Sequence, residues 1–181
     1  MLDDPESVWV ANRGGACTAA SVLAALRLLG LKSPLELGEV TLALGARQPF
    51  GPPVLLDYFG LPGRRARLDR RIEALAGEQG LAVRALTRPT LPGLPVRPAK
   101  DELLVANLAW GQERPGVYGS WGWNILRPHT YSTGGHSVLL TAVEGRQWLV
   151  LDPNHAGLQR WPRPGVAVTL TRIHRAARSS R

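Results

Sequence analysis

The chain has 181 residues and a net charge of +8, and 44% of its residues are hydrophobic while 20% are charged. This length and composition fit one globular domain and exclude disorder throughout. The 20 glycines and 15 prolines exclude a pure helical bundle. The absence of an apolar run of about 18 residues excludes a membrane-spanning helix. The single cysteine excludes both a disulfide within the chain and a Cys-rich zinc site. The first six residues are acidic and lack the basic segment of a signal peptide, so we expect a cytoplasmic protein.

The first expected helix covers residues 17–29 and begins directly at the cysteine. Val22 and Leu26 recur there at helical spacing, and Gly30 is a natural stop. Many of its residues are alanine or serine, so other backbones can approach this helix closely.

Two further helices are expected over residues 33–45 and 67–76. Ser33 is expected to cap the first of them, with Pro34 at its first position and Glu36 completing a capping box. The second is basic and amphipathic.

The second half of the chain has the apolar runs and turn residues of β-strands. Between these elements we expect a loop with one helical turn over 47–63, a proline-rich linker over 88–98 and a long aromatic loop over 110–135. Helices early and antiparallel strands late predict a single α+β domain, with a helical part over about 15–77, a sheet part over about 81–172 and a basic tail over 173–181. The expected strands are 81–86, 103–108, 137–143, 147–151 and 166–171.

Cys17 is the first residue that suggests chemistry. The unpaired N–H groups and the dipole at a helix N-terminus stabilise an anion, and therefore a nucleophilic thiolate. Gly14 and Gly15 before it allow close approach of a substrate and leave N–H groups for an oxyanion. The alternative is that Cys17 is a small buried hydrophobic residue of an alanine-rich helix.

His136 follows Gly135 and begins the most apolar strand of the chain. A polar ring at a strand edge, after an aromatic loop, is expected to face a cleft. There His136 would hold Cys17 as a thiolate and then protonate the leaving group. The alternative is a histidine that plays only a structural role.

Asp152 ends the next strand and is the expected partner of His136, where it would orient the imidazole. If Glu144–Arg146 form a three-residue hairpin loop, Val138 pairs with Asp152, and Asp152 shares a face with His136. A two-residue loop puts the two residues on opposite faces unless a bulge intervenes. Asn154 is the second choice for orienting the ring.

Two blocks of the sequence resemble papain-like cysteine peptidases. Gly15-Ala16-Cys17-Thr18-Ala19-Ala20-Ser21 is similar to their segment around the catalytic cysteine, and Gly135-His136-Ser137-Val138-Leu139-Leu140 is similar to their histidine strand. The order Cys, His, Asp fits that superfamily too. Leu151-Asp152-Pro153-Asn154, with Gly157 and Trp161, looks most like its C39-like branch. The resemblance implies a papain-like α+β fold, with a helical lobe, a twisted sheet and the site between them.

One position departs from the family. Papain-like peptidases usually have a Gln six residues before the Cys, and here that residue is Ala11. Asn12 is the nearest amide and is the expected substitute in the oxyanion hole. Losing one such donor costs about 10²–10³ in rate, so the activity is expected to be slow or lost if Asn12 does not reach.

The sequence therefore predicts a Cys17–His136–Asp152 hydrolase that cleaves a peptide or amide bond, without metal or other cofactor. Gly14, Gly15, Trp121, Trp123 and Gly135 are the expected substrate-binding residues. The alternatives are an acyltransferase with the same triad or an inactive peptide-binding module. A less favoured partner is nucleic acid, bound through a basic cluster of residues, Arg64, Arg65, Arg67, Arg70 and Arg71.

Overall fold

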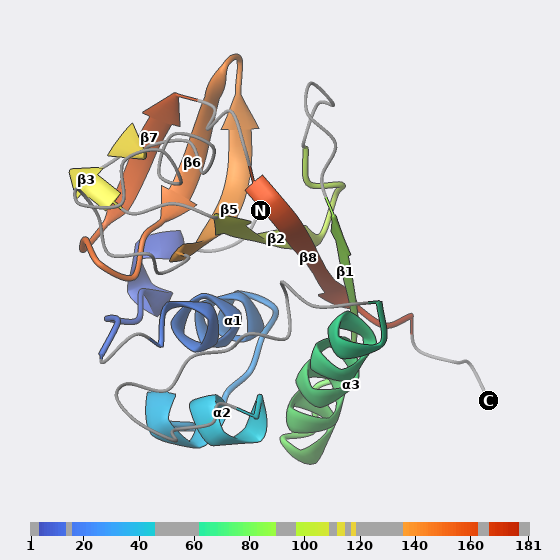
Figure 1. The fold of residues 1–181 in the computed structure, drawn as a ribbon. Coiled ribbons are helices and arrows are strands. Elements are labelled where there is room, and N and C mark those ends of the chain that lie inside the picture. Colours follow the sequence, from blue (N-terminus) through green and yellow to red (C-terminus); the bar gives the residue numbers. More distant parts are fainter. Residues whose placement is uncertain are drawn as a thin grey trace, which may run out of the picture.

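The computed structural model describes residues 4–13, 16–45, 62–89, 97–108, 112–114, 117–118, 136–162 and 167–177. The fold is α+β, with three helices packed against a six-stranded antiparallel sheet of order β1-β8-β2-β5-β6-β7 (Figure 1). A 3-10 turn η1 (Pro5–Val8) precedes α1 (Cys17–Leu28), α2 (Leu37–Ala43) and α3 (Pro62–Glu78). The strands are β1 (Val83–Pro89), β2 (Glu102–Leu108), β3 (Gln112–Arg114), β4 (Val117–Tyr118), β5 (His136–Glu144), β6 (Gln147–Leu151), β7 (Leu158–Pro162) and β8 (Ala167–Arg175).

The sheet contains every strand that the sequence predicted, and two differences concern β7 and β8. β7 was not predicted; it pairs with β6 along its whole length, from Gln147↔Pro162 to Leu151↔Leu158. β8 runs on to Arg175, which pairs with Val83 of β1. The prediction of a tail from residue 173 was therefore wrong at its start, because Ile173 is fully buried in the sheet.

The loop predictions fall largely on residues outside the described part of the chain. Of the predicted loop over 47–63, the structure describes only residues 62 and 63, which begin α3. Of the predicted linker over 88–98, residues 88 and 89 end β1. Of the long loop over 110–135, it describes β3 and β4, which pair as a small two-stranded sheet.

α2 begins later than predicted, and the prediction that Ser33 caps it was wrong. Glu36 is the N-cap residue, and its N–H donates to Glu39 Oε2 at 2.8 Å. Tertiary contacts keep the preceding residues out of the helix, because Leu35 is buried and its carbonyl accepts a hydrogen bond from Arg27 at 3.2 Å.

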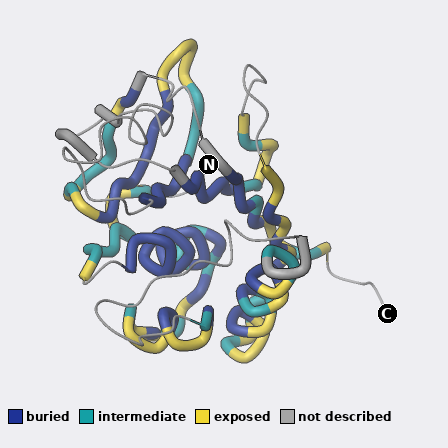
Figure 2. The backbone as a smooth tube through the Cα atoms, in the orientation of Figure 1, coloured by how far each residue is buried: buried dark blue, intermediate teal, exposed yellow. Residues whose placement is uncertain are grey.

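The sheet is buried on both faces (Figure 2). One apolar core joins the helices to the sheet, with Leu23, Leu26 and Ile72 packed against Leu103 and Leu139. A second core lies on the other face and contains Leu104, Leu140, Trp148 and Trp161. This alternation along β2 and β5 is the period of two that side chains follow in a strand.

Arginines from distant elements cap the ends of α1 and α2. Arg175 Nε donates to the Leu29 carbonyl at 2.7 Å, and Arg71 Nη1 donates to the Leu44 carbonyl at 3.0 Å. A cation at a helix C-terminus satisfies free carbonyls and the dipole. Each guanidinium lies against a glycine of positive φ, Arg175 against Gly30 and Arg71 against Gly45, so a Cβ at either glycine would clash with it. Part of the arginine excess thus stabilises the fold.

The β5–β6 hairpin has a two-residue turn, so the predicted three-residue loop was wrong. Glu144 pairs with Gln147, and Gly145 has a φ of +58°, as the first position of a tight hairpin turn requires. The register then shifts at a bulge between Leu140 and Ala142. The bulge restores the pairing of Leu139 with Leu151, which sets Asp152 beside Val138 on the face predicted for it.

Candidate active site

The cysteine and the histidine meet where α1 reaches the end of the sheet. Cys17 is the first residue of α1 and His136 is the first residue of β5, and α1 packs directly on β5. Both residues are buried, with 6% and 5% of their surface exposed. The α1 N-terminus, with N–H groups that lack intrahelical partners, therefore lies beside the imidazole.

His136 and Asp152 form a buried hydrogen bond, with Nε2 of the ring 2.9 Å from Asp152 Oδ1. The Asp152 carboxylate has no exposed surface, and the same Oδ1 accepts the backbone N–H of Asn154 at 2.9 Å. Since Nε2 is engaged by the carboxylate, Nδ1 is the ring nitrogen left for Cys17. Asn154, the second choice for orienting the ring, thus supports Asp152 through its backbone.

The charges of the pair shift both pKa values toward a thiolate and an imidazolium. Burial raises the pKa of the Cys17 thiol, but the hydrogen bond to His136, its positive charge and hydrogen bonds from Ser137 outweigh burial, so that the pKa lies below 9.0. Burial lowers the pKa of His136, but the hydrogen bonds to Asp152 and Cys17, with the charges of both, raise it from 6.5 to about 9. Proton transfer from sulfur to nitrogen is thereby favoured.

A buried polar chain next to the pair was not foreseen from the sequence. Ser137 Oγ donates to Asn107 Oδ1 at 2.8 Å and lies 2.8 Å from Thr18 Oγ1. Asn107 Nδ2 donates to Thr169 Oγ1 at 3.0 Å. Ser137 and Thr18 are the direct neighbours of His136 and Cys17 in the chain. The signal in the sequence was Asn107, a single amide inside the apolar run 103–108.

The segment before Cys17 is fastened to the turn after β6. Trp9 Nε1 donates to the Asp152 carbonyl at 2.7 Å, and the Asn12 N–H donates to the Pro153 carbonyl at 2.7 Å. Asn12 Nδ2 donates to Asn154 Oδ1 at 2.8 Å, while Asn12 Oδ1 is buried without a hydrogen-bond partner among the described residues. These bonds set Asn12, the expected oxyanion residue, beside the Asp152 turn. Trp9 was not predicted to contribute.

The expected substrate-binding residues lie outside the described part of the chain, namely Gly14, Gly15, Trp121, Trp123 and Gly135. Among the described residues, no three His, Cys, Asp or Glu side chains come together in a way that could hold a metal ion. No helix within those ranges has the length and apolar character needed to cross a membrane.

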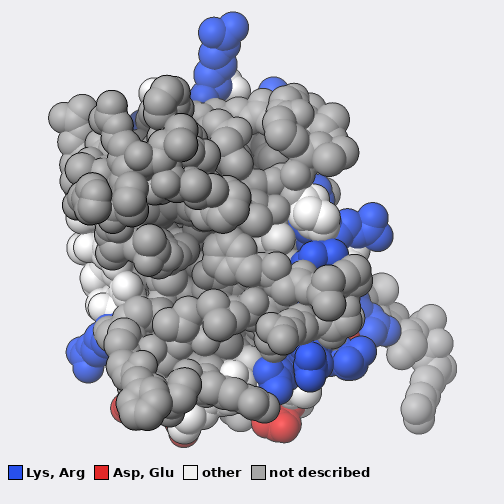
Figure 3. All heavy atoms as spheres, in the orientation of Figure 1, with Lys and Arg blue, Asp and Glu red and all other residues white. Residues whose placement is uncertain are grey.

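Lysine and arginine side chains gather on the side of the molecule where α3 lies (Figure 3). Of the predicted basic cluster, Arg67 and Arg70 are exposed, whereas Arg71 caps α2 as described above. The side chain of Arg64 is outside the description. Nucleic-acid binding by this cluster stays a prediction.

Neither the models of known protein families nor the sequences of curated proteins match this chain. Among solved structures, a chain from Bacillus anthracis described as a "putative C39-like peptidase" has the same fold, with a TM-score of 0.52. The match covers 96% of this chain and 98% of that chain at 10% sequence identity. The α+β fold in which Cys17, His136 and Asp152 are held is therefore that of a C39-like peptidase structure.

Proposed function

We propose that this protein is a cysteine peptidase that uses Cys17, His136 and Asp152. The observation that carries the proposal is the buried ring of His136, which bonds to Asp152 at 2.9 Å and to Cys17 at the N-terminus of α1. Acyl transfer needs a nucleophile, a base that contacts it and a group that orients the base.

In the first half of the reaction, the Cys17 thiolate attacks the carbonyl carbon of an amide, and the carbonyl oxygen becomes an oxyanion. The tetrahedral intermediate collapses when the His136 imidazolium donates its proton to the leaving amine, which leaves a thioester on Cys17. In the second half, His136 takes a proton from water as the water attacks the thioester, and the acid product is released. The same parts perform acyl transfer if an amine replaces the water.

The pH dependence of alkylation tests the activated pair. Iodoacetamide reacts with thiolates, so Cys17 is expected to be labelled rapidly at pH 6, where an ordinary thiol is protonated. In His136→Ala, labelling should appear only above about pH 8, as for a free thiol. His155→Ala, at another described histidine, is the control and should label like the wild type. Slow wild-type labelling at pH 6 would overturn the proposal.

The oxyanion would be held by the free N–H groups at the start of α1 and by Asn12. Rotating the amides of Asn12 and Asn154 together reverses their hydrogen bond and turns the buried, unpartnered Asn12 oxygen into an N–H donor. This supports a role for Asn12 in place of the Gln that is common in papain-like peptidases.

Asn12→Leu is therefore expected to lower kcat/KM for a peptide substrate by about 10²–10³ while the alkylation rate of Cys17 stays unchanged. Asn154→Ala removes the same side-chain hydrogen bond but no oxyanion donor, and should have a much smaller effect. If Asn12→Leu slows alkylation as much as hydrolysis, Asn12 positions Cys17 and does not hold the oxyanion.

A further inference from the structure

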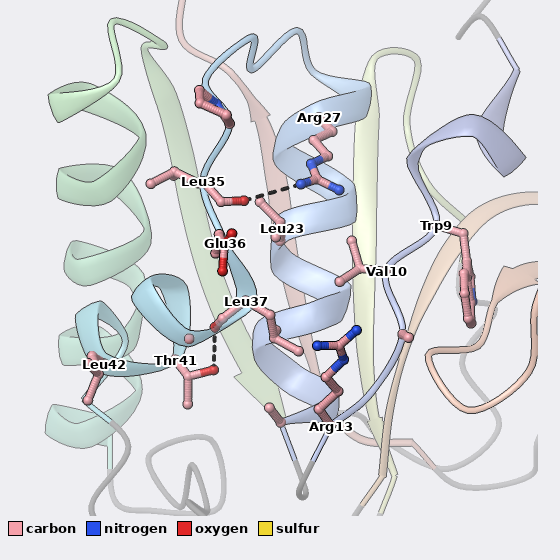
Figure 4. A pocket seen from close by; sticks show the side chains of 14 residues that line it. Trp9, Val10, Arg13, Leu23, Arg27, Leu35, Glu36, Leu37, Thr41 and Leu42 are labelled. Atoms are coloured by element: carbon pink, nitrogen blue, oxygen red, sulfur yellow. Dashed lines mark hydrogen bonds between the residues drawn. The ribbon is translucent and has the colours of Figure 1, made fainter.

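A groove of about 840 Å³ runs along α1, between residues 9–13 and the segment over 34–42 (Figure 4). Its walls are largely apolar, with Val10 and Leu23 facing Leu35 and Leu37 across the opening. None of the triad residues lines it. It is therefore a separate feature from the Cys17–His136–Asp152 cluster.

The groove nevertheless extends to Ala16, the residue directly before Cys17. Ala16, Leu23 and Arg27 line it and have the spacing of one helix face. Each residue advances about 100° around a helix of 3.6 residues per turn, so Cys17 lies roughly a quarter turn from that face. The groove and the Cys17 side chain therefore adjoin at the start of α1.

Two arginines extend into the groove from the side of residues 9–13 and α1. Figure 4 shows Arg13 at the end near the start of α1 and Arg27 at the other end. Arg13 is exposed and forms no ion pair with any residue in the described part of the chain. Arg27 uses one N–H for the Leu35 carbonyl and keeps others, because a guanidinium has five.

One carboxylate opposes these cations. Glu36 stands on the opposite wall, before α2. The groove therefore carries a net positive charge that is concentrated on one wall. The arginines would attract an acidic side chain of a bound peptide, and Glu36 would repel it.

We infer that this groove binds one side of an extended peptide substrate and selects acidic side chains through Arg13 and Arg27. The inference rests on the proposed peptidase function, since it assigns the substrate class of that site. Apolar side chains of the same peptide would pack on the leucine wall. A guanidinium binds a carboxylate in a bidentate, charge-assisted geometry, which explains the preference for an acid over an amide.

The spacing of the two acids follows from helix geometry. Arg27 is ten residues after Cys17 in α1, which is about 15 Å along the helix axis at 1.5 Å per residue. An extended peptide covers roughly 3.3 Å per residue, so the second acid would lie about four to five residues from the scissile bond. The acid that meets Arg13 would lie closer to it.

The test measures binding to the Cys17→Ala protein by fluorescence anisotropy, so that no turnover interferes. The probes are fluorescein-labelled peptides of Leu, Ala and Gly that carry two Glu, two Gln or two Lys residues four apart. We expect the Glu peptide to bind about 10-fold or more tightly than the Gln peptide, and more weakly as salt rises. Arg13→Gln should remove most of this preference and Arg13→Lys should restore part of it. Arg146→Gln, at the exposed turn of the β5–β6 hairpin, is the matched control and should change nothing.

Equal affinity for the Glu and Gln peptides, or a preference that survives Arg13→Gln, would overturn the inference. Cleavage of the same peptides by the wild type separates it from the proposed function. Cleavage without a preference for Glu would support the peptidase function and contradict the selection of acidic side chains. The opposite outcome is tight, Arg13-dependent binding of the Glu peptide without cleavage, together with slow alkylation of Cys17. It would support the acid-selective groove and contradict the peptidase function.

Discussion

Replacing Asp152 by Ala is expected to have the largest effect on activity, with kcat/KM falling about 10³–10⁴-fold. The hydrogen bond to this carboxylate does the most to raise the pKa of His136 against the effect of burial. Without it, only Cys17 offsets the burial that disfavours the charged ring, so the pKa of His136 falls below about 9, and the pKa of Cys17 rises as the positive charge beside it is lost. Alkylation of Cys17 should then require higher pH. NMR titration of the ring protons of His136 would measure the first change, and iodoacetamide labelling the second.

Asp152→Asn separates orientation from charge. One oxygen, Oδ1, accepts both the His136 bond and the Asn154 N–H, and an amide oxygen in the same place can accept both. We expect this variant to keep the ring in place and to lose less activity than Asp152→Ala. Glu144→Gln is the control on the same hairpin, because its ion pair with Arg160 is exposed and contributes little. An Asp152→Ala protein with an unchanged labelling profile would show that Asp152 does not act on the pair.

The pH profile of hydrolysis should differ from that of alkylation at its alkaline end. His136 loses its proton as the pH rises through about 9, and hydrolysis should fall there because the leaving amine loses its acid. Alkylation needs only the thiolate and should not fall. Both should fall at low pH, as the thiolate of Cys17 is protonated.

Asn107→Leu is expected to have the second large effect, on stability and on the pKa of Cys17 together. Asn107 is fully buried, and its removal leaves Thr169 Oγ1 without the amide that donates to it and leaves Ser137 Oγ with Thr18 Oγ1 as its partner in the polar chain. Each buried polar group left unpaired costs roughly 1–3 kcal/mol of unfolding free energy. Urea unfolding measures this loss.

The pKa of Cys17 should fall in Asn107→Leu. The Ser137 hydroxyl has one proton, which Asn107 Oδ1 accepts at 2.8 Å and which also helps to lower the pKa of the Cys17 thiol. When Asn107 no longer competes for that proton, the hydroxyl donates more fully to the Cys17 thiolate, which stabilises the anion further. The alkylation profile should therefore shift to lower pH, and the double variant with Ser137→Ala should reverse the shift.

Thr41→Val is the matched control, because it also removes a buried hydroxyl, one that donates to the Leu37 carbonyl within α2 at 2.6 Å. It should destabilise the protein without moving the labelling profile. An Asn107→Leu protein that unfolds more easily but labels exactly as before would limit Asn107 to a structural role. Ser137→Ala alone should raise the pKa of Cys17, because the side-chain hydrogen bond from Ser137 helps to hold that pKa down.

The positions of single elements were predictable where neighbours in the sequence decide them. α1 begins at Cys17 as predicted, because the apolar spacing and the small residues act within a few turns. α2 was misplaced by several residues, because the bond from Arg27 to the Leu35 carbonyl and the burial of Leu35 hold the preceding segment extended. β7 was missed, because its strand character depends on pairing with β6.

By itself, the sequence determined the chemistry that this protein carries: one thiol at the start of a helix, one imidazole at the start of an apolar strand and a carboxylate at the end of the next. These are local properties, set by residue type and by neighbours a few positions away. Only the tertiary structure decided which atoms meet. The bulge after Leu140 brings Asp152 to the face of His136 despite a two-residue turn, and packing of α1 on β5 joins residues about 119 positions apart, such as Thr18 and Ser137. Contacts of that range depend on register and on the packing of whole elements, which no short stretch of sequence encodes.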